Sequence, residues 1–87
     1  MSASAERLRE AIALAAGGDW QGAHAIVQEH EDDPLACWIH AVVHRQEGDL
    51  SNARYWYRQG RREPGEPLSF AAELKEVEAA LAAREGR

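Results

Sequence analysis

An internal repeat with an offset of thirty residues is the feature that most constrains how this chain folds. In each copy a Gly-Asp pair is followed by an alanine, and a proline closes the unit. The matching residues are Gly18-Asp19, Ala23 and Pro34 in the first copy, and Gly48-Asp49, Ala53 and Pro64 in the second. A unit of this length cannot bury its apolar face alone, so neighbouring copies stack. The repeat therefore predicts two stacked units within a single domain over residues 1–87.

The Gly-Asp pairs predict tight turns between helices. Glycine at a helix end adopts the left-handed conformation, and the aspartate that follows caps the amides of the next helix. Asp33-Pro34 gives a further start signal, because proline is tolerated at the first helical position. No segment shows the alternation of apolar and polar residues that would predict a β-strand. We expect an all-α fold of antiparallel hairpins with helices at about 4–16, 20–31, 34–47, 50–62 and 68–84, and a short linker at 63–67.

Composition and charge narrow the classes of function. The chain has 45% hydrophobic residues, which favours a folded domain, and a net charge of −5, which works against nucleic acid and anionic membranes as partners. Its single cysteine excludes a disulfide framework and indicates a reducing compartment. Charged residues interrupt the first twenty positions, so neither a signal peptide nor a membrane span is expected. We expect a soluble, cytoplasmic protein.

The order of these residues resembles the tetratricopeptide repeat over roughly residues 4–64, although the offset is thirty rather than about thirty-four. The matching positions are Ala11, Gly18-Asp19-Trp20, Ala23 and Pro34, then Ala41, Gly48-Asp49-Leu50, Ala53, Tyr57 and Pro64. The resemblance implies a concave surface, formed by the first helix of each hairpin, that binds peptides or other proteins. It maps this surface to Leu8, Ile12, Trp38, Val42 and Arg45.

A row of arginines is the most distinct charged feature. Arg54, Arg58 and Arg61, here called the arginine row, lie one turn apart on one face of the predicted fourth helix. These arginines could bind an acidic peptide or a phosphate group. Alternatively they form a solvated face whose cations suit the negative end of the helix.

Histidine spacing allows a metal site. His40 and His44 lie four residues apart on one helical face, and Cys37 lies one turn earlier. The sequence favours a structural role for these histidines. Their face packs against the fourth helix, and the imidazoles form hydrogen bonds with Tyr57, the backbone or Glu47. A catalytic Cys37 is disfavoured, because a cysteine in the middle of a helix is usually a small buried hydrophobe. His24 and His30 are six apart and share no face, so we expect no metal, cofactor or catalytic residue.

These observations predict a protein-interaction module or a small self-associating scaffold. The alternative is a metal-binding or enzymatic protein that uses Cys37, His40 and His44, with His24 as a further ligand. Two hairpins and a final helix leave apolar surface uncovered, so we expect a homodimer. Its interface is expected at Trp38 or along the apolar positions of the last helix, namely Phe70, Leu74, Val77 and Leu81.

Overall fold

The computed structural model describes residues 4–63 and 69–86. These residues form five helices and no strand, which confirms the all-α fold. The helices are α1 (Ala5–Ala16), α2 (Trp20–Val27), α3 (Pro34–Glu47), α4 (Leu50–Gln59) and α5 (Phe70–Glu85). None of the described helices combines the length and the apolar character needed to cross a bilayer.

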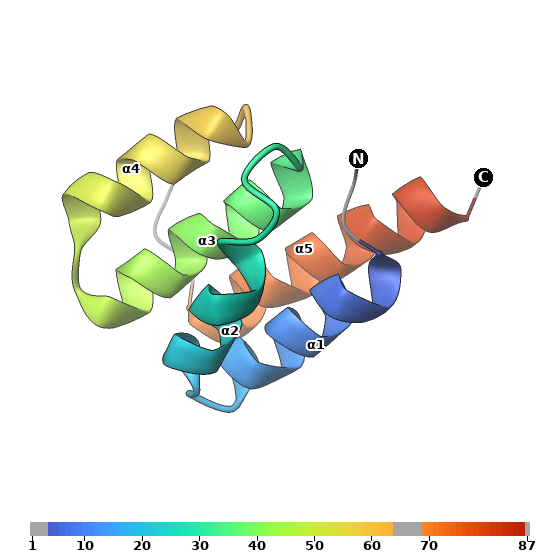
Figure 1. The fold of residues 1–87 in the computed structure, drawn as a ribbon, viewed down its shortest axis with the longest axis horizontal. Helices are drawn as coiled ribbons and strands as arrows, with labels where there is room; N and C mark the ends of the chain where they lie inside the picture. The colour runs from blue at the N-terminus through green and yellow to red at the C-terminus, as the bar shows by residue number, and fades with distance from the viewer. Residues whose placement is uncertain (1–3, 64–68, 87) are drawn as a thin grey trace.

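Helix α3 is the centre of the molecule. Helices α1 and α2 form one antiparallel hairpin, α3 and α4 form a second, and α5 lies along α1 and α3 (Figure 1). Every residue from Leu35 to His44 is buried, because α3 has neighbours on all sides. The small side chains of Ala23, Ala41 and Ala53 are also buried, which lets the helices of the core approach closely.

Aspartate caps begin three of the five helices, as the sequence predicts. The side chains of Asp19, Asp33 and Asp49 accept hydrogen bonds from the backbone amides of residues 22, 35 and 52. Gly18 and Gly48 have φ values of 90° and 91°, the left-handed conformation that ends the preceding helix without a steric penalty.

Two predicted helix ends are wrong. Helix α2 stops at Val27 rather than at residue 31, because the chain must turn to place Asp33 in the extended conformation that caps α3. Helix α4 stops at Gln59 rather than at residue 62. Gly60 follows it, and a Cβ there would lie 3.0 Å from the carbonyl oxygen of Pro34. This close approach of two backbones, and the positive φ of 61° at Arg61, end the helix.

The last helix begins at Phe70 and ends at Glu85, with the Ser69 side chain as its N-cap. The predicted start at residue 68 and most of the predicted linker lie outside the described residues. Helix α5 covers the surface that the tetratricopeptide resemblance assigns to a peptide. Four of the five residues expected there are buried: Leu8, Ile12, Trp38 and Val42. These four side chains belong to the core of the described residues, whereas Arg45 is only partly buried.

The apolar positions of α5 face the same core. Leu74, Val77 and Leu81 are at most 2% exposed, and only Phe70 reaches the surface, at 39%. The expected dimer interface at Trp38 or along these positions is therefore occupied by contacts within one chain. The sequence pattern that indicates a seam between chains is satisfied here by packing between α5 and helices α1 and α3.

A buried carboxylate fixes α5 in this position. Glu73 accepts hydrogen bonds from Trp38 Nε1 at 2.9 Å and from the Tyr57 hydroxyl at 2.6 Å. Its second oxygen pairs with the guanidinium group of Arg45. Burial and the bond to Glu73 raise the pKa of Tyr57, which keeps the phenol protonated as a donor. One side chain of α5 thus joins two residues of α3 to one of α4.

Candidate functional site: a cluster of three histidines

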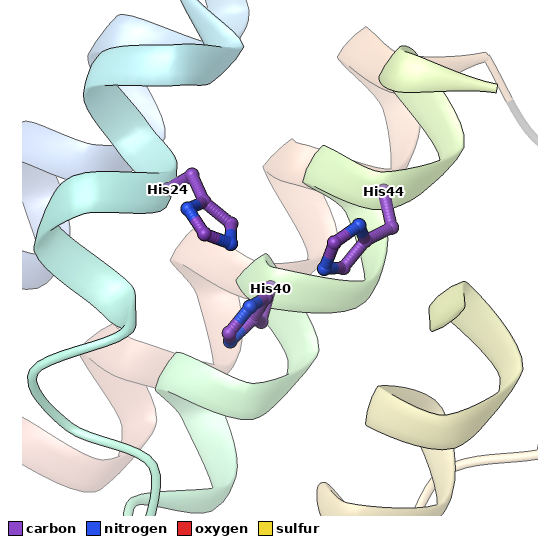
Figure 2. A group of neighbouring side chains, drawn as sticks. All are labelled: His24, His40 and His44. Carbon is purple, nitrogen blue, oxygen red and sulfur yellow. The ribbon is translucent and has the colours of Figure 1, made fainter. Parts of the chain in front are cut away.

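Three histidines from two hairpins meet between α2 and α3. His24 comes from α2, and His40 and His44 come from successive turns of α3 (Figure 2). The ring centroids are 4.8 Å apart for His24 and His40, 5.4 Å for His24 and His44, and 5.0 Å for His40 and His44. One ring nitrogen from each residue lies within 4.8 Å of the other two. We call this group the three-histidine cluster.

His40 forms the buried base of the cluster. Its side chain is 2% exposed, and its ring stacks on Trp56 at a centroid distance of 3.9 Å. Within the described part of the chain, its Nδ1 atom is buried and has no hydrogen-bond partner. Burial, reinforced by the neighbouring His24 and His44, lowers the pKa of His40 to about 3. The ring is therefore neutral near pH 7, and one polar atom in the core is unsatisfied.

His44 is held by a carboxylate. Its Nδ1 atom lies 2.8 Å from an oxygen of Glu47, one turn later on α3. In a neutral ring, Nδ1–H donates to this carboxylate, and Nε2 keeps the free lone pair. The hydrogen bond thus sets both the tautomer and the orientation of the ring, as carboxylates do for histidines that bind metals.

A pocket of about 290 Å³ lies beside the cluster. It is lined by Trp20, Gln21, His24, His44, Glu47, Asp49 and Asn52. Two of the three histidines border this pocket, whereas His40 does not. Since Gln21, Glu47 and Asn52 are exposed residues, the pocket opens to solvent.

Part of this arrangement follows the sequence predictions. His40 contacts α4 as expected, because its ring stacks on Trp56. The expected contact between His44 and Glu47 is also present. The predicted hydrogen bond of His40 is not found at its Nδ1 atom among the described residues.

Cys37 does not take part in the cluster. Its thiol donates to the backbone carbonyl oxygen of Glu31 at 3.2 Å. Burial and the nearby carboxylates, Asp33 foremost among them, raise the pKa of this thiol, which disfavours the thiolate that a metal or an electrophile needs. Among the described residues, the group of possible metal ligands around His40 contains His24 and His44 and does not include Cys37.

The sequence offered His24 only as a further ligand in the alternative function, and its spacing gave no reason to place it beside His40 and His44. Spacing along one helix compares residues of that helix only, so it separates His24 from His30 and says nothing about partners on α3. The available signal was the pair of small residues Ala23 and Ala41. Both are fully buried, and each is adjacent to a histidine of the cluster.

The remaining predicted site residues lie elsewhere. Of the arginine row, Arg54 and Arg58 are exposed on α4, whereas Arg61 is exposed beyond the end of that helix. None of the three forms an ion pair with a described residue. Arg45 pairs with Glu73, and its guanidinium carbon lies 4.9 Å from the centre of the Phe70 ring. The arginine row is thus separate from the three-histidine cluster and is free to meet solvent or a partner.

Comparison of the chain with protein-family models finds no match, and neither do the comparisons with curated proteins and with solved structures.

Proposed function

We propose that this protein binds a divalent transition metal ion, with zinc as the expected ion, through His24, His40 and His44. The observation that carries the proposal is the buried His40 ring, whose Nδ1 has no partner among the described residues although two further imidazoles lie beside it. A buried polar atom without a partner costs about 1 to 3 kcal/mol. A metal ion held by the three rings would give the orphaned imidazole a partner.

The distances support this proposal. Zinc binds histidine nitrogens at about 2.0 to 2.1 Å, so two ligands of a tetrahedral site lie about 3.3 Å apart. The three nitrogens lie within 4.8 Å of one another, so binding one ion requires the rings to move closer together. Imidazole nitrogens suit Zn²⁺, Co²⁺, Ni²⁺ and Cu²⁺, whereas Ca²⁺ and Mg²⁺ require oxygen ligands.

A metal at this position would join the two hairpins. His24 belongs to the first hairpin, and His40 and His44 belong to the second. Because the three histidines are brought together only in the folded chain, binding is coupled to folding. The metal ion then acts as a cross-link between α2 and α3.

Titration of metal-free protein with Co²⁺ and Zn²⁺ tests the proposal. We expect one ion per chain and a gain of about 2.7 kcal/mol in the free energy of unfolding at a metal concentration of a hundred times Kd. Cobalt should also quench tryptophan fluorescence, since Trp56 stacks on His40. His24→Ala and His40→Ala should each abolish the stoichiometric site.

His30→Ala is the matched control, because His30 lies after α2 and outside the cluster. It should bind the metal like the original protein. Circular dichroism verifies that each variant is folded. The proposal is wrong if folded protein binds no ion at millimolar metal, or if His30→Ala loses binding as strongly as His24→Ala.

The outer face of α4 favours a second candidate function, which is binding to a protein. Leu50 and Tyr55 are 58% and 44% exposed, and they accompany the arginine row. A chain with a net charge of −5 offers a basic helix face to the acidic surface of a second copy. Because the expected interface at Trp38 is buried, this face is the surface we propose for the homodimer.

Light scattering at high micromolar concentration tests the homodimer. We expect twice the chain mass at low salt and the mass of one chain at 0.5 M salt, because salt screens charge pairs between exposed groups. The double variant Arg54→Gln and Arg58→Gln should be monomeric at both salt concentrations, whereas Lys75→Gln on α5 should behave like the original protein. A monomer mass for the original chain at low salt would contradict the proposal.

A further inference from the structure

The pocket beside the three-histidine cluster gives the proposed metal site a second component. We propose that the bound ion keeps one coordination position open to this pocket, and that the pocket admits a small uncharged nitrogen or oxygen donor to that position. This inference rests on the proposed function, since it needs a metal held by His24, His40 and His44.

The number of ligands is the first step of the argument. Within the described residues, the group of possible metal ligands around His40 has three members, all of them histidines. A tetrahedral ion therefore has one position without a protein ligand, as in catalytic rather than structural zinc sites. Glu47 and Asp49 form a separate group with His44 that includes neither His24 nor His40. Glu47 is already engaged by the Nδ1 side of the His44 ring.

The direction of the open position is the second step. The buried ring of His40 is backed by Trp56, which leaves no room for a ligand on that side. His24 and His44 border the pocket, and their rings meet edge to face on either side of the cluster (Figure 2). An ion held by the three nitrogens thus has its open position on the side of the pocket.

The charge of the pocket is the third step. Its wall contains two carboxylates, Glu47 and Asp49, and no lysine or arginine. These carboxylates offset the charge of a divalent ion and oppose the entry of an anion. Trp20 supplies an apolar wall, and the amides of Gln21 and Asn52 supply polar groups. A volume of about 290 Å³ suits a small molecule. The pocket therefore selects an uncharged donor over an anionic one.

The visible absorption spectrum of the cobalt-loaded protein tests this inference, because the spectrum reports the ligands of the ion. Imidazole serves as the uncharged donor and azide as the anion. Imidazole is used at concentrations that leave cobalt bound, as verified by gel filtration. We expect imidazole to change the spectrum at a lower concentration than azide does.

Asp49→Asn removes one charge from the pocket and keeps the cap of α4, because asparagine caps helices as well as aspartate does. This variant should bind azide up to about tenfold more tightly, with little change for imidazole. Asp19→Asn makes the same change at the equivalent cap of α2, which does not line the pocket, and should leave both affinities unchanged.

The outcomes separate the two proposals. If cobalt does not bind, the proposed function fails and this inference fails with it. If cobalt binds to the three histidines but imidazole leaves its spectrum unchanged, the open position is wrong and the metal site stands. If azide binds more tightly than imidazole, or if Asp49→Asn and Asp19→Asn behave alike, the assignment of an uncharged donor is wrong.

Discussion

Replacing Glu73 with alanine should lower the free energy of unfolding by about 3 to 5 kcal/mol, the cost of removing one partner from a buried ion pair. Glu73 is 7% exposed and holds Trp38, Arg45 and Tyr57 at once. Its removal leaves a buried indole N–H, a buried hydroxyl and a largely buried guanidinium group without their shared acceptor. A domain of this size has a total stability of about 5 to 10 kcal/mol, so the variant is expected to be close to unfolding.

Urea unfolding followed by circular dichroism measures this effect. Glu76→Ala is the matched control, because Glu76 lies one turn later on α5 and is exposed, and it should change stability by less than about 0.5 kcal/mol. The free energy of unfolding of Glu73→Gln should lie between those of Glu73→Ala and Glu76→Ala. Its amide oxygen still accepts a hydrogen bond but cannot neutralise the charge of Arg45. Equal stability of the Glu73→Ala and Glu76→Ala variants would show that Glu73 does not fix α5.

Acid should destabilise the metal-free protein through His40. The pKa of His40 is about 3 in the folded chain, below its ordinary value of 6.5. Above pH 6.5 the ring is neutral in both states, and its contribution to stability is complete. As the pH falls from 6.5 to 3, His40 becomes protonated in the unfolded chain but stays neutral in the folded chain. The free energy of unfolding therefore declines. At about 1.4 kcal/mol for each pKa unit, the loss between pH 7 and pH 4 is about 3 kcal/mol.

His40→Phe isolates this effect, because phenylalanine keeps an aromatic ring against Trp56 and does not titrate. The free energy of unfolding is measured at pH 7 and at pH 4 with a chelator present. Its decrease between these two pH values should be about 3 kcal/mol smaller in His40→Phe than in the original protein. All other ionisable side chains are common to both proteins, so their contributions largely cancel in the difference. His30→Phe should retain the full pH dependence of the original chain. Identical pH dependence in the His40→Phe variant and the original would contradict the assignment.

The local signals of the sequence predict most of the helices correctly. Helix starts at Trp20, Pro34 and Leu50 depend on caps within three residues, so they can be read without knowledge of the fold. The wrong ends of α2 and α4 depend on distant segments. The close approach of Gly60 to the backbone at Pro34 and Trp38 exists only after the second hairpin has closed.

The sequence predicts only part of the candidate site, because the rest depends on contacts between distant segments. His40 and His44 share a face of one helix, which a spacing of four residues reveals. His24 joins them only because α2 packs across α3, and no pattern within one helix encodes that crossing. Likewise, the amphipathic pattern of α5 predicts a buried face but does not say which surface covers it. Helices α1 and α3 take that place instead of a partner protein.

The position of α5 has a consequence for how the chain unfolds. In a simple array each repeat touches only its neighbours, so the units can melt one at a time. Here α5 packs on α1 of the first hairpin and α3 of the second, and Arg9 pairs with Glu85 while Arg84 pairs with Asp33. Opening either hairpin therefore breaks contacts of the same C-terminal helix. The two hairpins lose their independence, and the molecule melts in one cooperative transition rather than repeat by repeat.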